Sequence, residues 1–144
     1  MAGIRVSATG ATLTLNGHIF NNLIEGDVIE LNPVNAKTSH VNGIQSGDVT
    51  ISTRSDGDVR DLIVRVQRFS EDDVFLNSAL NQDFPEIFEG SLKETFIRNG
   101  TEGTESWILE NGSITDQPSR VKNTQDGNAV MQYTMRFRNA VRSL

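Results

Sequence analysis

The sequence predicts a mostly β protein, an antiparallel β-sandwich or barrel with one flanking α-helix over about residues 70–82. Three observations predict this class. Short segments alternate apolar and polar residues, turn signals such as Asn-Gly separate them, and a single segment has helical spacing instead. The alternation is clearest in the last predicted strand, where one side is apolar and the other polar, as in an antiparallel sheet. The two sides are Met131, Tyr133, Met135 and Phe137, and opposite them Gln132, Thr134, Arg136 and Arg138.

Length and composition limit the function classes. We expect the 144 residues to form one domain, 1–144. A net charge of −6, from 13 basic and 19 acidic residues, argues against non-specific binding of nucleic acid and against binding to an anionic membrane. The absence of cysteine excludes disulfides and thiolate metal sites, and two histidines argue against a histidine-rich metal site. Because the first residues lack the apolar run of a signal peptide, we expect synthesis in the cytosol.

The N-terminal quarter predicts an arm followed by short strands. Residues 1–10 are small and polar, and we expect them to form a loose N-terminal arm. A strand over Thr12 to Leu15 ends at Asn16-Gly17, which is a hairpin signal because both residues tolerate positive φ. His18 to Ile24 is the expected returning strand, and Asp27 to Leu31 a further one.

Residues 32–47 differ in character, with little periodicity and several Asn, Gly and Pro residues. They predict a long loop or an extended flap. Loops longer than about 12 residues in compact domains are usually functional or disordered. The apolar Val34, Val41 and Ile44 favour a loop that makes subunit contacts, and a plain disordered loop is the alternative.

Two more strands precede the predicted helix, and the second runs directly into it. Residues 48–54 alternate again and predict the first, and residues 62–69 are β-branched, aromatic or long and predict the second. Ser70 and Asp73 match the capping pattern at a helix N-terminus, where the acidic residues 71–73 are favourable. The helix is expected to end at Asp83-Phe84-Pro85, since a residue before proline avoids helical angles.

The C-terminal half predicts further strands and turns. In the strand from Glu86 to Ile97, Phe88, Leu92 and Phe96 share one face, which Glu94 interrupts. A hairpin turn over 99–103 leads to a strand over 105–110, and Asn111-Gly112 predicts a turn before a short strand over 113–115. A polar connection, 116–128, precedes the last strand.

No residue pattern predicts chemistry, so catalytic, cofactor-binding and metal-binding residues are all predicted to be absent. Asp56-Gly57-Asp58 lacks the full EF-hand loop and indicates a turn. His18 is interpreted as a strand residue, and neither a nucleophile elbow nor a phosphate-binding glycine loop occurs. Arg136, Arg138 and Arg142 are expected to form salt bridges with acidic neighbours. We therefore predict a protein that is not an enzyme.

The order of these motifs resembles that of bacteriophage tail tube proteins, in particular the inner tube of contractile tails. The resemblance covers roughly residues 11–139 and rests on turns and strand patterns. The motifs are Asn16-Gly17, the strand 26–31, Asp56-Gly57-Asp58-Val59, the strand–helix unit with Asp72-Asp73 and Phe75-Leu76-Asn77, and Asp126-Gly127-Asn128-Ala129-Val130-Met131. It implies a β-sandwich with a flanking helix, six copies per ring, and stacked rings that form a tube for DNA. Sheath, baseplate or tail-terminator proteins would be the partners, and the virion tail the location, after synthesis in the bacterial cytoplasm.

A tube made of sheet needs one polar strand face towards its channel. Small hydroxyls and mixed charge would let DNA slide, and they predict lumen residues on two strands. These candidates are Thr50, Ser52, Glu89, Ser91, Lys93 and Thr95. The polar face of the last strand is expected outside or at a subunit contact, because its arginines would hold phosphate. Two alternatives stay open, a monomeric ligand- or protein-binding β-sandwich and a secretion-system tube protein.

Overall fold

The structure, a computed structural model, describes residues 3–26, 28–125, 127 and 129–144. Position 27 in a predicted strand, and positions 126 and 128 in the motif before the last strand, lie outside the described residues. The elements are β1 (Ile4–Leu15), β2 (His18–Ile19), β3 (Ile29–Pro33), β4 (Thr38–Asn42), β5 (Val49–Thr53), β6 (Arg60–Gln67), α1 (Glu71–Leu80), β7 (Phe88–Arg98), β8 (Thr101–Asp116) and β9 (Val130–Ser143). The described residues contain no helix with the length and apolar character of a membrane-spanning segment.

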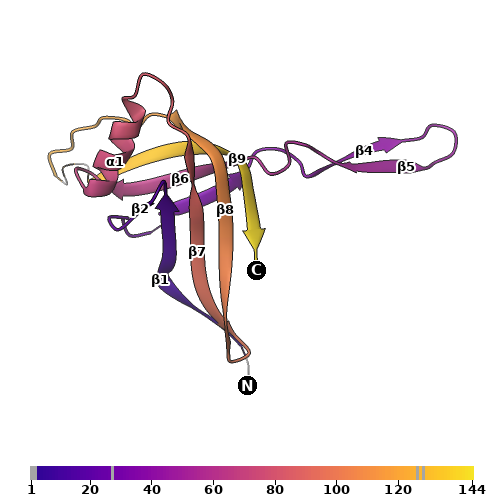
Figure 1. The fold of residues 1–144 in the computed structure, drawn as a ribbon, viewed down its shortest axis with the longest axis horizontal. Coiled ribbons are helices and arrows are strands. Elements are labelled where there is room, and N and C mark those ends of the chain that lie inside the picture. Colours follow the sequence, from indigo (N-terminus) through magenta and orange to yellow (C-terminus); the bar gives the residue numbers. More distant parts are fainter. Residues whose placement is uncertain (1–2, 27, 126, 128) are drawn as a thin grey trace.

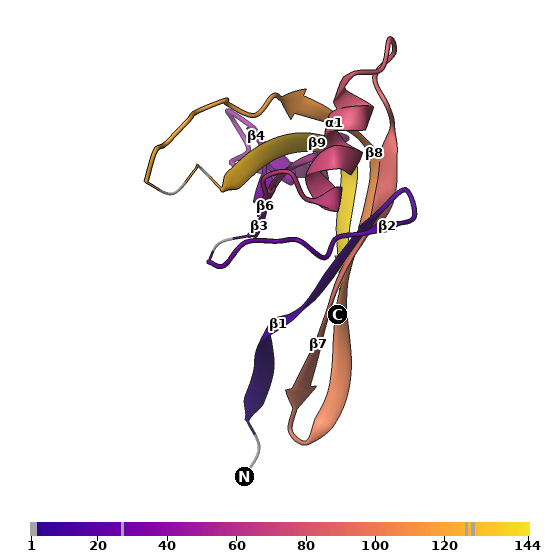
Figure 2. The ribbon, with the colours of Figure 1, turned by 90° about the vertical axis from the view of Figure 1, so that its left-hand side faces the viewer.

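Seven of the described strands form one antiparallel sheet in the order β2-β1-β7-β8-β9-β6-β3, and β4 pairs with β5 alone. In Figure 1, β1, β7 and β8 run down the view, whereas β6 and the first part of β9 run across it. The sheet therefore wraps around the core, and α1 lies beside its upper end (Figures 1 and 2). The prediction of a mostly β fold with one flanking helix is confirmed, although the sheet does not close into a barrel.

The core lies on the concave side of this sheet. Leu13, Leu62, Val64 and Leu109 are fully buried there, and Leu76 of α1 joins them. Ser70 caps the helix as predicted, because its side chain accepts a hydrogen bond from the backbone N–H of Asp73. The helix thus covers apolar strand faces that would otherwise meet solvent.

The prediction of a loose N-terminal arm over residues 1–10 is wrong from residue 4 onward, and residues 1–2 lie outside the described residues. Ile4, Arg5 and Val6 pair with the far end of β7, from Phe96 to Arg98, so β1 begins at Ile4. The small polar residues 7–10 interrupt this pairing without ending the strand. A long-range partner decides the conformation here, and local composition does not reveal such a partner.

The predicted returning strand 18–24 is shorter than expected. It consists of His18 and Ile19, followed by one isolated bridge between Leu23 and Val66. The reason is the buried carboxylate of Asp72, which accepts hydrogen bonds from the backbone N–H groups of Asn21 and Asn22 at 3.0 and 2.6 Å. These groups are therefore satisfied without a partner strand.

The predicted turn at Asn111-Gly112 is also wrong, because β8 continues through it as one 16-residue strand. Asn111 adopts a left-handed φ of 53° inside the strand. A Cβ on Gly112 would lie 2.3 Å from the Phe137 ring, so glycine is needed for this close approach. An Asn-Gly pair can thus bend a strand as well as reverse it.

The predicted salt bridges of the C-terminal arginines are largely confirmed. Arg136 Nε lies 2.8 Å from Asp61 Oδ1, and Arg142 Nε lies 2.7 Å from Glu105 Oε2. Arg138 instead donates to the backbone carbonyl of Ser55 at 2.8 Å.

Candidate assembly surfaces

The segment predicted as a loop or flap is half of a projecting hairpin, which we define as residues 38–53 with its tip at 43–48. β4 and β5 pair over five residues each, and Figure 1 shows them extending away from the body of the sheet. Every strand residue of the hairpin is exposed. A lone two-stranded hairpin is marginally stable in water, and among the described strands β4 and β5 pair only with each other.

The predicted contact residues Val34, Val41 and Ile44 are all exposed. Ile44 at the hairpin tip is 100% exposed and Val41 on β4 is 66% exposed. Val34 lies nearer the body, where its N–H donates to the carbonyl of Val59 at 3.2 Å. Two of the three therefore belong to the projecting hairpin, and Val34 to its base.

The second surface is the convex side of β1, β7, β8 and β9, which we call the hydroxyl face. Cross-strand partners lie on the same face of a sheet, so the register identifies its members. Its hydroxyl and charged members include Thr12, Thr14, Ser91, Lys93, Thr95, Thr104, Ser106 and Ser143, and the exposed apolar residues Ile108 and Val141 lie on the same face. Lys93 stands between Thr12 and Ser106, and its side chain has no hydrogen bond or ion pair among the described residues.

The structure separates the predicted lumen residues into two groups. Ser91, Lys93 and Thr95 lie on the hydroxyl face, and exposed Glu89 lies where the pairing of β7 with β8 is irregular. Thr50 and Ser52 lie on the projecting hairpin instead, opposite Val41 and Ser39. The sequence did not identify Thr12, Thr14, Thr104 and Ser106, because each takes its place on this face from strand register alone.

The four-stranded part of the sheet has an open edge on each side. In the described chain, β1 pairs with β2 only at Thr14 and Leu15, which leaves one side of its N-terminal part unpaired. On the other side, β6 pairs with β9 no further than Phe137, so the end of β9 from Val141 is unpaired there. Unpaired strand edges are templates for pairing with another chain.

A buried polar cluster holds α1 against the sheet. Asp72 Oδ1 lies 2.7 Å from His18 Nε2, and the imidazole stacks on Phe75 with ring centroids 4.3 Å apart. Asp73 accepts hydrogen bonds from the Tyr133 hydroxyl at 2.7 Å and from the backbone N–H of Phe69 at 2.9 Å. Burial, and then the bond to Asp73, raises the pKa of Tyr133. Both carboxylates are therefore fully used in holding α1 to the sheet. We call Asp72, Asp73, His18 and Tyr133 the clamp.

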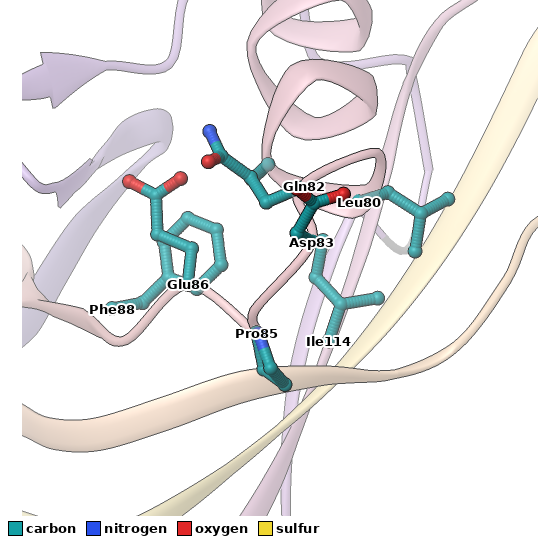
Figure 3. Close-up of a pocket in the computed structure, with 8 residues that line it drawn as sticks. Leu80, Gln82, Asp83, Pro85, Glu86, Phe88 and Ile114 are labelled. Atoms are coloured by element: carbon teal, nitrogen blue, oxygen red, sulfur yellow. The ribbon is translucent and has the colours of Figure 1, made fainter.

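A pocket of about 170 Å³ lies at the C-terminal end of α1, between the helix and β7 (Figure 3). Leu80, Phe88 and Ile114 line it together with the loop residue Pro85. Glu86 at its edge accepts a hydrogen bond from Asn16 Nδ2 at 3.3 Å. The pocket is smaller than a typical site for a small molecule, about 300–1,000 Å³.

Comparison with known proteins adds a clear structural likeness. A chain in the sheath/tube terminator of the extracellular contractile injection system PVC matches with a TM-score of 0.64 and 11% identity, covering 97% of each chain. A chain in the tube-terminating cap of the anti-feeding prophage matches with a TM-score of 0.66 and 12% identity, covering 96% of this chain and 91% of that one.

A chain in the PVC sheath–tube complex gives a TM-score of 0.65 at 8% identity, again covering 96% of this chain and 91% of that one. The chain has the tube-type fold of contractile injection systems. This tube-type fold extends over nearly the whole sequence. No protein-family model and no curated protein sequence matches the chain.

Proposed function

We propose that the chain is a non-enzymatic structural subunit of a contractile-tail tube, which assembles with itself into stacked, hexameric rings. One observation carries the proposal: the tube-type fold presents a hydroxyl-rich sheet with an open edge on each side. A head-to-tail contact between the two edges uses different surfaces of each copy and closes into a ring when the rotation permits. The number six comes from the resemblance to tail tube proteins.

In this arrangement the hydroxyl face lines the channel. Ser91 and Thr95 contribute hydroxyl groups and Lys93 a positive charge, and Glu89, two residues before Ser91 on β7, adds a charge of opposite sign next to this face. Such a surface offers few fixed contacts to a passing polyanion, and the acidic chain as a whole repels it. DNA is the proposed cargo, as in phage tails, and a sheath with baseplate or terminator proteins provides the partners outside the chain.

The projecting hairpin is the proposed link between copies. Its base is held together, since the N–H of Arg54 donates to the carbonyl of Lys37 at 2.9 Å. Replacing residues 38–53 by an Asn-Gly turn should therefore leave the body folded, because the hairpin contributes no buried residue. The shortened protein should show unchanged urea unfolding and form no tubes by electron microscopy.

Ile44→Ser is the matched control, since it keeps the hairpin and removes only its most exposed apolar side chain. We expect this variant to assemble more weakly than the unmodified protein. Normal tubes from the shortened protein would show that the hairpin extends into solvent and is not needed for contact between copies.

A tube terminator is the second candidate, favoured by the equal likeness to the terminator and cap structures. The two candidates differ in length of assembly. A tube subunit stacks indefinitely at raised concentration, whereas a terminator stops at single rings. Monomers in all conditions would favour the monomeric alternative, a ligand- or protein-binding β-sandwich module.

A further inference from the structure

Four Asn-Gly pairs occur in the sequence, and the structure gives them different surroundings. Asparagine is a thermolabile residue, and a glycine after it has no Cβ to shield its own backbone nitrogen. When that nitrogen is free, it can attack the side-chain amide of the asparagine before it. The pairs are Asn16-Gly17, Asn42-Gly43, Asn99-Gly100 and Asn111-Gly112.

The side-chain amide of Asn16 is held in place at both polar atoms. Its Nδ2 donates to Glu86 Oε1 at 3.3 Å and to the carbonyl of Ile87 at 3.1 Å. Its Oδ1 accepts a hydrogen bond from the backbone N–H of Glu89 at 2.9 Å. Three hydrogen bonds must therefore open before this amide can turn towards the nitrogen of the next residue.

In two other pairs the glycine is restrained instead. Gly112 is buried within β8 against the ring of Phe137, and it pairs with strands on both sides. The N–H of Gly43 donates to the carbonyl of Asp48 at 2.6 Å, which closes the tip of the projecting hairpin. Because a lone hairpin is marginally stable, this second bond opens more often than bonds in the body of the sheet.

The pair Asn99-Gly100 has none of these restraints. It forms the two-residue turn between β7 and β8, with φ values of 54° and 76°, and both residues are exposed. Among the described residues, the Asn99 side chain has no hydrogen bond and the N–H of Gly100 has no acceptor. A Cβ on Gly100 would meet nothing within 4 Å, so the space around this nitrogen is open. Figure 1 shows the turn at the lower extremity of the molecule, beside the N-terminus.

We propose that Asn99 is the principal site of spontaneous deamidation in the folded protein. The nitrogen of Gly100 loses its proton and forms a bond to Cγ of Asn99. The bond from Cγ to Nδ2 breaks, and the amide nitrogen leaves with a proton as ammonia. The product is a cyclic imide, which water opens at either of its two carbonyl groups. Opening at the side-chain carbonyl gives aspartate at position 99, and opening at the backbone carbonyl gives isoaspartate.

Both products change the turn that holds the start of β1. The N–H of Asn99 donates to the carbonyl of Gly3 at 3.1 Å, and Ile4 pairs with Arg98. Aspartate adds a negative charge here, and isoaspartate also leads the backbone through its Cβ, so the turn no longer has the length that matches the strand twist. We therefore expect modification to loosen β1 from Ile4 to Val6. This inference concerns the single chain and does not depend on the proposed function.

Peptide mapping by mass spectrometry tests the assignment. Dilute protein is kept at mildly alkaline pH, once folded and once in urea, and the mass increase at each pair is followed with time. In the folded protein Asn99 should react about tenfold or more faster than Asn16, since each hydrogen bond that must open at Asn16 slows its reaction roughly two- to twelvefold. Asn42 should be second. In urea the four rates should become similar, because the local chemistry is the same.

The matched control is Asn99→Gly, which removes the amide and keeps a residue that tolerates positive φ in the turn. Hydrogen exchange of the peptide that contains Ile4–Val6 is measured before and after incubation. Exchange should become faster in the unmodified protein in proportion to the modified fraction at position 99. It should not change in Asn99→Gly, in which the other three pairs are still present.

The possible results separate the site from its effect. A rate at Asn16, Asn42 or Asn111 in the folded protein that equals or exceeds the rate at Asn99 would overturn the assignment. The same order and spread of rates in urea would also overturn it, because the structure would then select nothing. Unchanged exchange over Ile4–Val6 after complete modification would overturn the effect on β1.

Discussion

Removal of a single buried hydroxyl tests the clamp that holds α1 to the sheet. The hydroxyl of Tyr133 donates to Asp73 Oδ1 at 2.7 Å, and both side chains are buried. Tyr133→Phe deletes this bond and keeps the ring. Since Asp73 still accepts the N–H of Phe69, its carboxylate is not left without a donor.

The structure fixes the size of the expected effect. A hydrogen bond to a charged group contributes roughly 1.5–3 kcal/mol, and the remaining donor places Tyr133→Phe near the lower end, at about 1.5–2 kcal/mol. The matched control is Ser39→Ala, which deletes an exposed hydroxyl paired with Ser52 and should change the free energy of unfolding by less than about 0.5 kcal/mol. Urea unfolding, followed by the fluorescence of the single tryptophan, measures both values.

The same variant predicts a change at alkaline pH. The folded-state pKa of Tyr133 is raised above its ordinary value of 10.0, first by burial and then by Asp73. Its contribution to stability is complete below pH 10 and is lost as the pH rises through the folded-state value. The free energy of unfolding should therefore fall above pH 10 more steeply in the unmodified protein than in Tyr133→Phe. Equal slopes, or a loss below about 0.5 kcal/mol at neutral pH, would refute the clamp.

Three further predictions concern the sheet, the core and the channel. In Gly90→Ala the new Cβ would lie 1.8 Å from the Thr14 carbonyl oxygen, so we expect a loss of about 1–3 kcal/mol in urea unfolding, with Gly3→Ala, which has open space, unchanged. Leu76→Ala should cost about 2–5 kcal/mol, because the side chain is fully buried, and a smaller loss would place α1 outside the core. The double variant Thr50→Lys with Ser52→Lys should still form tubes. It should slow DNA ejection, at low salt, only if the hairpin reaches the channel, and the effect should fade as salt rises. Ser91→Lys with Thr95→Lys should slow DNA ejection at low salt if the hydroxyl face lines the channel. If neither double variant changes the rate of ejection, neither surface lines the channel.

The strands with regular alternation and the capped helix could be predicted from sequence. β6 and β9 bury apolar residues at every second position, from Leu62 to Val66 and from Tyr133 to Phe137, and Ser70 with Asp73 marks the start of α1. Here local preference and tertiary packing agree, which is the condition for prediction from a single sequence.

The remaining errors have long-range causes. Residues 4–6 become strand because β7 offers them a partner more than 85 residues away, and Asn21 and Asn22 leave the sheet because Asp72 accepts hydrogen bonds from their backbone N–H groups. For the candidate surfaces, the apolar residues Val41 and Ile44 were found from the sequence. The division of the lumen residues between the hydroxyl face and the projecting hairpin depends on strand pairing.

Electron cryo-microscopy of the purified protein at raised concentration tests the central proposal most directly. We predict hollow tubes of stacked rings, with Ser91 and Thr95 on the channel wall and the projecting hairpin in contact with a second copy. Monomers at every concentration and salt condition, or rings with the hydroxyl face on the outer surface, would contradict the proposal.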